Sequence, residues 1–303
     1  MAVDLSSEIA GLKLRSPLLL SSGILGLDWR LMKRALDSGA AAVVTKSLTL
    51  APRRGFPNPT LVEIGCGLLN AMGIPNPGVR EFIPEIERLK GIGATVIVSV
   101  AGESPGDYAE AAKLAEGAGA DAIEANVSCP HVGGVAEIGQ DPEALGEVVA
   151  ELRDALRVPL IVKLSPNVAD IAKMARVAEE AGADAISAIN TVKGMAIDIY
   201  ARRPILSAGV GGLSGPAIKP IALRCVYEVR RAVGLPIIGC GGIVDWADAV
   251  EFLMAGANAL GIGSAIYYRD LSVFREILGG MERFIEENGY GGVRDLIGLA
   301  HRA

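Results

Sequence analysis

AEGAGADAIEAN (residues 115–126), AEEAGADAISAIN (178–190) and LMAGANALGIGS (253–264) repeat one design along the chain. Each stretch reads as the end of a helix, a turn made of alanine and glycine, and a short apolar strand. A unit that recurs in this form is typical of a parallel sheet whose strands are joined by helices.

Short apolar strands recur along the whole chain, each followed by turn residues and a segment with helical periodicity. The apolar runs are nearly continuous, as in strands that are buried on both faces of a parallel sheet. The eight expected strands are PLLLSSG (17–23), AAVVTKS (41–47), TVIVSVAG (95–102), AIEANVSCP (122–130), PLIVKLSP (159–166), AISAINT (185–191), PIIGCGG (236–242) and ALGIGSA (259–265). No GxGxxG motif follows the first strand, so an open dinucleotide-binding sheet is disfavoured. The pattern predicts a closed (β/α)8 TIM barrel that occupies residues 1–303 as a single domain.

The composition restricts the class of function. Of the 303 residues, 50% are hydrophobic, and the formal net charge of -6 offers no basic surface for nucleic acid or an anionic membrane. The four cysteines contain no CxxC pair, which argues against a disulfide framework or a structural zinc site. The apolar run at residues 16–27 is too short to span a bilayer, and no targeting segment is visible. We therefore expect a cytoplasmic protein that acts on small molecules.

Two segments, residues 50–79 and 194–215, do not fit the repeat. Each follows the C-terminal end of an expected strand, and active sites of barrel enzymes lie at those ends. We therefore expect both insertions to build the site and not to link domains.

Polar side chains gather where the expected strands end. They are Lys46, Asn126, Cys129, Lys163, Asn190 and Thr191, and the insertions add Asn70 and Gly215. Amides offer both donors and an acceptor, so several of them suit a planar ligand such as a flavin ring or a pyrimidine. The last two strands end in Gly241, Gly242, Gly263 and Ser264, where many barrels bind a phosphate through backbone N–H groups. The pattern predicts a phosphorylated cofactor.

These residues also have simpler interpretations. A lysine at a strand end can be an ion-pair partner or a Schiff-base nucleophile, and a free thiol is most often a small buried apolar residue. We apply the second interpretation to Cys225, in an expected helix, and to Cys240, inside the seventh strand, and leave Cys66 open. Cys129 differs because it lies in a loop followed by glycines, beside His131, so it is the candidate base or His-activated nucleophile.

The motifs together resemble the dihydroorotate dehydrogenases, the flavoproteins of pyrimidine synthesis, along nearly the full length. The matching stretches are SSG (21–23), TKSLT (45–49), NAMGIPNPG (70–78), NVSCP (126–130), VKLSPN (162–167), INT (189–191), GGLSGPAIKP (211–220), GCGGI (239–243) and GIGSA (261–265). The resemblance implies oxidation of (S)-dihydroorotate to orotate in de novo pyrimidine (UMP) biosynthesis, with FMN as the cofactor. A base removes the proton at C5 while a hydride leaves C6 for flavin N5. In the soluble class 1 enzymes the base is a loop cysteine, which maps to Cys129.

The resemblance also implies which residues bind each ligand, and it implies no metal. The pyrimidine would be held by Lys46, Asn70, Ala71, Met72, Gly73, Ile74, Asn126, Asn190 and Thr191. FMN would be held by Ser22, Thr45, Lys46, Asn126, Lys163, Ile189, Gly215, Gly241, Gly242, Gly263 and Ser264.

Four stretches are similar to the NAD-linked subclass, class 1B: NPT (58–60), GLLNAMGIPNPGV (67–79), SPNV (165–168) and GGLSGPAIKP. That subclass implies a catalytic homodimer that a second subunit, carrying FAD and a 2Fe-2S cluster, joins into a heterotetramer. The cysteines of this chain lack the spacing for such a cluster, so it would belong to the partner. The loop departs from the family pattern at His131, where asparagine is expected, and near Ile138, where an aromatic residue is expected.

Two alternatives remain at this point. A fumarate-linked dihydroorotate dehydrogenase, or a related flavin barrel that oxidises a dihydropyrimidine, would keep the same motifs. A barrel that binds a phosphorylated ligand without catalysis would keep the glycine loops but has no need of a base at Cys129. A colourless protein that binds no flavin would favour this last alternative.

Overall fold

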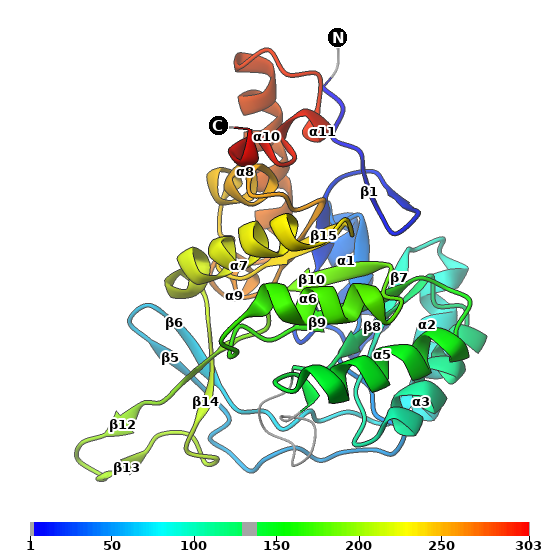
Figure 1. Ribbon diagram of the computed structural model, residues 1–303. Coiled ribbons are helices and arrows are strands. Elements are labelled where there is room, and N and C mark those ends of the chain that lie inside the picture. The colour runs from blue at the N-terminus through cyan, green and yellow to red at the C-terminus, as the bar shows by residue number, and fades with distance from the viewer. Residues whose placement is uncertain (1–2, 129–137, 303) are drawn as a thin grey trace.

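The computed structural model describes residues 3–128 and 138–302, and its centre is a closed barrel of parallel strands (Figure 1). The barrel strands are β3 (Leu18–Leu20), β4 (Ala42–Val44), β7 (Val96–Val100), β8 (Ala122–Asn126), β9 (Leu160–Leu164), β10 (Ala185–Ala188), β15 (Ile237–Cys240) and β16 (Ala259–Ile262). Their order round the barrel is β10-β15-β16-β3-β4-β7-β8-β9, so neighbours in the barrel follow one another along the chain. All eight predicted strands are present, which confirms the predicted (β/α)8 barrel.

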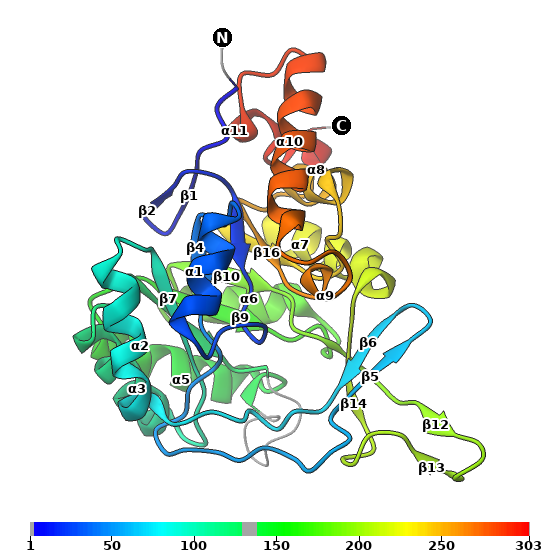
Figure 2. The same ribbon diagram turned by 180° about the vertical axis from the view of Figure 1, so that it is seen from behind.

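Helices surround the barrel, as Figures 1 and 2 show from opposite sides. The longer ones are α1 (Trp29–Asp37), α2 (Val79–Gly91), α3 (Pro105–Gly117), α5 (Pro142–Ala155), α6 (Ile171–Glu180), α7 (Lys219–Ala232), α8 (Trp246–Met254) and α10 (Ser272–Glu287). Shorter ones are α9 (Ala265–Arg269), α11 (Val293–Leu296), and the 3-10 helices η1 (Pro216–Ile218) and η2 (Leu299–His301). Within the described ranges, no helix has both the length and the apolar content that a bilayer crossing requires.

The repeated alanine-glycine turn ties each helix to the sheet. Gly119, Gly182 and Gly256 have φ of 98°, 101° and 113°, a left-handed conformation that favours glycine. Two residues later, a side-chain oxygen accepts a hydrogen bond from the first backbone N–H of the preceding barrel strand. These bonds join Val96 N to Asp121 Oδ2 (2.7 Å), Leu160 N to Asp184 Oδ2 (2.8 Å) and Ile237 N to Asn258 Oδ1 (3.0 Å). The sequence repeat therefore reflects a repeated contact between a turn and the neighbouring strand.

An apolar layer fills the amino-terminal end of the barrel. Inward-facing residues of the strands, among them Leu19, Ile97 and Ile161, form one buried cluster. The antiparallel hairpin β1 (Ser7–Ile9) and β2 (Leu12–Leu14) adds Ile9 and Leu14 to this cluster. Burial of these side chains closes the end of the barrel opposite the carboxyl ends of the strands.

The two insertions form one sheet. Its strands are β5 (Leu61–Ile64), β6 (Gly67–Asn70), β11 (Val192–Gly194) and β14 (Gly211–Ser214), in the order β11-β14-β6-β5. The central pair joins the insertions, with Leu69 opposite Leu213 and Asn70 opposite Gly212. A smaller hairpin, β12 (Ile197–Asp198) and β13 (Arg203–Pro204), extends beyond this sheet and away from the barrel (Figure 1).

Candidate active site

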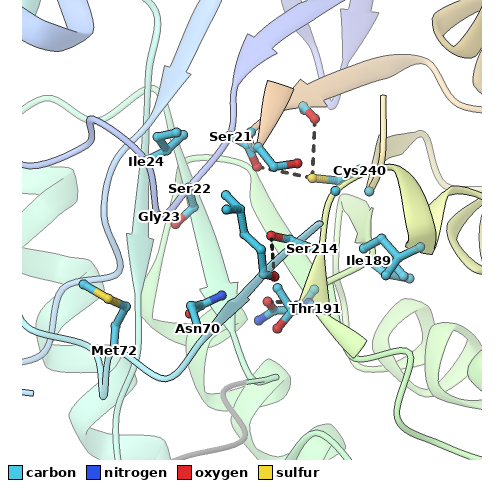
Figure 3. Close-up of a pocket in the computed structure, with 18 of the residues that line it drawn as sticks. Ser21, Ser22, Gly23, Ile24, Asn70, Met72, Ile189, Thr191, Ser214 and Cys240 are labelled. Carbon is cyan, nitrogen blue, oxygen red and sulfur yellow. Dashed lines mark hydrogen bonds between the residues drawn. The ribbon is translucent and has the colours of Figure 1, made fainter. Parts of the chain in front are cut away.

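A cavity of about 340 Å³ lies at the carboxyl ends of the barrel strands. Its walls come from the strand ends and from β5, β6 and β14 of the insertion sheet, and Figure 3 shows side chains from both sources around it. This volume is within the range of small-molecule sites, about 300–1,000 Å³. Both insertions therefore contribute to the walls, as the sequence predicts.

Most residues predicted for the site line this one cavity. The predicted substrate residues on its walls are Lys46, Asn70, Met72, Gly73, Ile74, Asn126, Asn190 and Thr191. The predicted cofactor residues on its walls are Ser22, Lys46, Asn126, Lys163, Ile189, Gly215, Gly241, Gly242, Gly263 and Ser264. Cys129 and His131 lie outside the described residues, while Ile138 is described and buried. The role of each of these residues stays a prediction.

Thr45 and Ala71 do not line the cavity. Thr45 is fully buried, where its Oγ1 accepts from Ser99 N (3.0 Å) and donates to the Lys46 carbonyl (3.1 Å). Ala71 is also fully buried, and it packs in a small apolar cluster with Leu69. Side chains alternate between the faces of an extended chain, so one residue of a contiguous motif can face the ligand while the next faces the core.

Hydrogen bonds fix the asparagines that line the cavity. Asn126 Nδ2 donates to Ser47 Oγ (2.8 Å), and Asn190 Nδ2 donates to Ser128 Oγ (2.7 Å). Asn70 Nδ2 donates to a main-chain carbonyl of β14 (3.2 Å). Since Ser128 immediately precedes the predicted base, its bond to Asn190 anchors the start of that loop beside the amides. The amides are thus held in place before any ligand binds.

Gly215 lies beside the turn that contains Gly241 and Gly242, next to the start of α7. Gly215, Gly241 and Gly242 have φ of 101°, 129° and 78°. A Cβ atom at Gly242 would lie 2.8 Å from the Lys219 backbone nitrogen, and one at Gly215 would lie 2.9 Å from Gly67 Cα. Larger residues are therefore excluded, and main chain borders the cavity at these points. Exposed main chain of this kind suits a phosphate.

The structure corrects our interpretation of Cys240. We expected a buried packing thiol, but Cys240 lines the cavity, where its Sγ lies 3.2 Å from Ser21 Oγ (Figure 3). Strand β15 alternates its side chains, which directs Cys240 to the inner face of the barrel. Cys225 matches the expectation, since it is buried within α7 and burial raises the pKa of its thiol to about 11. Cys66 is exposed.

A buried ion pair lies beside this thiol. Lys163 Nζ is 3.6 Å from Glu124 Oε1, and the two side chains are 6% and 2% exposed. Burial acts to lower the pKa of Lys163, but attraction to the Glu124 carboxylate, with a smaller contribution from Cys240, outweighs it, so the pKa lies above its ordinary value. The cavity therefore holds a lysine that stays charged at neutral pH.

The residues present fit a flavin with a phosphate group. Amides with donors and acceptors suit the edges of the ring, the glycine loops suit the phosphate, and lysine charge suits a ring that becomes negative on reduction. Across residues 3–128 and 138–302, no three His, Cys, Asp or Glu side chains are grouped so as to hold a metal ion.

Sequence reasoning missed several residues of the cavity and its floor. The cavity is also lined by Ser21, Ser47, Ser214, Cys240, Gly261 and Tyr267. Ser21 and Cys240 could have been found from the two-residue alternation of the predicted strands, as could Glu124, which shares the inner face of β8 with Asn126. Tyr267 follows the glycine loop in α9, and the sequence offers no signal that its ring reaches the cavity.

Comparisons with known proteins show which family the chain belongs to. The family model for dihydroorotate dehydrogenase matches residues 4–285. The dihydroorotate dehydrogenase B (NAD(+)) catalytic subunit of Pyrococcus furiosus is 50% identical over 301 residues, which cover 99% of this chain and 100% of the relative. The protein of the same name from Methanothermobacter thermautotrophicus is 49% identical over 300 residues, with 98% of each covered.

A solved structure shares the fold. The crystal structure of DHODH from Eimeria tenella in complex with ferulenol superposes with a TM-score of 0.86 at 23% identity, covering 99% of this chain and 89% of that one. The family match over residues 4–285 and the relatives at about half identity show the family. The chain belongs to the dihydroorotate dehydrogenase family.

Proposed function

We propose that this chain is the FMN-dependent catalytic subunit of an NAD-linked dihydroorotate dehydrogenase. It oxidises (S)-dihydroorotate to orotate in pyrimidine biosynthesis. The observation that carries the proposal is that fixed asparagines, two lysines and the glycine loops line one cavity, in a chain of this family.

The asparagines orient the pyrimidine. Asn70, Asn126 and Asn190 come from three different elements, and hydrogen bonds to the protein hold each amide in place. The ring of dihydroorotate alternates C=O and N–H groups, and a side-chain amide can donate a hydrogen bond to the first and accept one from the second. Lys46 lines the same cavity and supplies positive charge for the substrate carboxylate. The asparagines and Lys46 thus account for the substrate side of the site.

The cofactor occupies the remainder of the cavity. Gly241, Gly242, Gly263 and Ser264 hold the phosphate through main chain, and Lys163 supports the ring. FMN, when bound, supplies the acceptor for the hydride that leaves C6 of the substrate. Cys129 takes the proton from C5, in a loop whose start is anchored through Ser128 to Asn190.

The acceptor and the assembly follow from the relatives. Those described above are named NAD(+)-type catalytic subunits, which supports a partner subunit for this chain. We infer a homodimer that a partner carrying FAD and a 2Fe-2S cluster joins into a heterotetramer. We place this assembly in the cytoplasm.

The experiment is anaerobic reduction of the purified chain. Its visible spectrum is recorded, and (S)-dihydroorotate is added while the oxidised-flavin band is followed. Bleaching within the mixing time is the expected result, because cofactor, substrate residues and base belong to one chain. A yellow protein that does not bleach would contradict dihydroorotate as the substrate. A colourless protein that cannot take up FMN would contradict the flavin assignment itself.

A further inference from the structure

The buried pair of Glu124 and Lys163 is not explained by ligand binding alone. Ala122 and Ile161 belong to the apolar layer inside the barrel. Residues two apart on a strand share a face, so Glu124 and Lys163 also point into the barrel, one layer nearer the cavity. Lys163 lines the cavity, whereas Glu124 is not on its walls. The carboxylate therefore lies behind the lysine as seen from the ligand.

Glu124 depends on Lys163 for compensation of its charge. The carboxylate is 2% exposed, and its Oε1 has no hydrogen-bond partner within the described residues. A buried carboxylate oxygen without a hydrogen bond is costly, and a cation nearby is the usual compensation. The Lys163 ammonium, 3.6 Å away, is that cation.

Lys163 likewise depends on Glu124. A lysine buried without a counter-ion releases its proton several pH units below its ordinary value. Within the described residues, the other titratable side chains that line this cavity are Cys240, on the inner face of β15, Lys46 and Tyr267. At this level the inner faces of β3, β7 and β10 carry serines, Ser21, Ser99 and Ser187, which do not titrate in the accessible range. Glu124 is therefore the carboxylate that keeps Lys163 charged.

We propose that Glu124 is a positioning residue, the buried counter-ion that keeps Lys163 protonated and directed into the cavity, and thereby controls how well the chain stabilises negative charge on the flavin. This inference rests on the proposed function for its second half, since it assigns Lys163 to the flavin. Its first half, the protonation of Lys163, concerns this chain alone.

The consequence for the flavin has a definite direction. A charged Lys163 next to a reduced, anionic ring favours reduction, so the flavin midpoint potential rises with protonation of the lysine. In Glu124→Gln the lysine loses its proton at a lower pH. The midpoint potential of the variant should therefore fall more steeply with pH than that of the wild type, over the range in which Lys163 titrates.

The decisive experiment titrates Lys163 directly in flavin-free protein. The chain is prepared with isotopically labelled lysine, the Lys163 signal is assigned by its absence in Lys163→Met, and spectra are recorded from about pH 6 to about pH 11. In the wild type, Lys163 should titrate above the ordinary range of a lysine, and in Glu124→Gln its midpoint should fall by about two pH units or more. Glu124→Asp, which keeps the carboxylate, should recover part of the shift.

Glu110→Gln is the matched control, because Glu110 pairs with Arg80 on the surface (2.8 Å) and should leave Lys163 unchanged. A wild-type Lys163 that titrates well below its ordinary value would overturn the proposal even if Glu124→Gln failed to fold. An unshifted midpoint in a folded Glu124→Gln would also overturn it.

The two halves of the inference can fail separately. If no flavin binds, the proposed function fails, while the flavin-free titration still decides whether Glu124 sets the protonation of Lys163. If Lys163 titrates as expected but the potentials of the wild type and Glu124→Gln respond to pH in parallel, the pair exists and its link to the flavin is wrong.

Discussion

A thiol that acts as a base must first lose its own proton. The ordinary pKa of a cysteine is about 8.5, so only a few per cent of an unperturbed Cys129 is thiolate at neutral pH. The rate of flavin reduction by dihydroorotate should therefore rise about tenfold per pH unit from about pH 6 and level off above about pH 8.5. Stopped-flow measurement of bleaching across this range checks the expectation.

The matching variant is Cys129→Ser. A hydroxyl is a far weaker base in the same place, so reduction at neutral pH should slow by about 10²–10⁴-fold while FMN stays bound. Cys66→Ser is the control, since Cys66 is exposed and does not line the cavity. An unchanged rate in Cys129→Ser would remove this residue from the role of base.

The sequence predicts that a residue lines the cavity where its position at the end of a strand is sufficient to place it there. Lys46, Asn126 and Lys163 end predicted strands and do line the cavity. Thr45 lies one residue before Lys46 and faces the core, because the direction of a side chain depends on the register of its strand. Cys240 is the opposite case, because the register of β15 turns a thiol expected to pack in the core toward the cavity.

At the scale of elements, the repeated turns were sufficient to predict the barrel. Each Ala-Gly-Ala turn ends a helix, and the following aspartate or asparagine holds the adjacent strand. The insertions were recognised only as irregular segments. Their pairing across Asn70 and Gly212 is antiparallel and joins residues 142 positions apart. Such a contact depends on the closed barrel bringing both loops to one face, and no local pattern encodes it.

The insertion sheet should be sensitive to a single methyl group at Gly212. A Cβ there would lie 2.7 Å from Thr191 Cβ, and Gly212 also accepts the Asn70 amide hydrogen bond. Gly212→Ala should displace both predicted substrate residues and lower kcat/KM for dihydroorotate by about ten- to a hundredfold, which corresponds to about 1–3 kcal/mol. FMN content should stay near that of the wild type, because the glycine loops are untouched.

Gly65→Ala is the control for this change. Gly65 lies in the turn between β5 and β6 of the same sheet, but no atom outside its chain neighbours is within 4 Å of its added Cβ, and its φ is not in the left-handed range. Steady-state kinetics gives kcat/KM for both variants, and flavin absorbance gives their FMN content. Equal kcat/KM for the two variants would mean that the insertion sheet does not position the substrate residues.

For the whole molecule, the proposed function requires a route by which electrons leave the flavin. The described residues contain no cluster of ligands for a metal centre, and the four cysteines of the sequence lack iron-sulfur spacing. The proposed transfer of electrons to NAD would therefore use a relay on another subunit, and the designation of the relatives as catalytic subunits is consistent with one.

If the relay is on another subunit, the chain alone should not reduce NAD. The chain alone, with dihydroorotate and NAD under anaerobic conditions, should bleach but form no NADH, measured by absorbance of the reduced nicotinamide. Addition of an electron-transfer subunit that carries FAD and a 2Fe-2S cluster should start NADH formation at a rate that saturates with that subunit. NADH formed by the chain alone would contradict the need for a partner. Rapid reoxidation by fumarate in place of NAD would instead place the chain with the fumarate-linked enzymes, because a small acceptor would then have to enter the cavity itself.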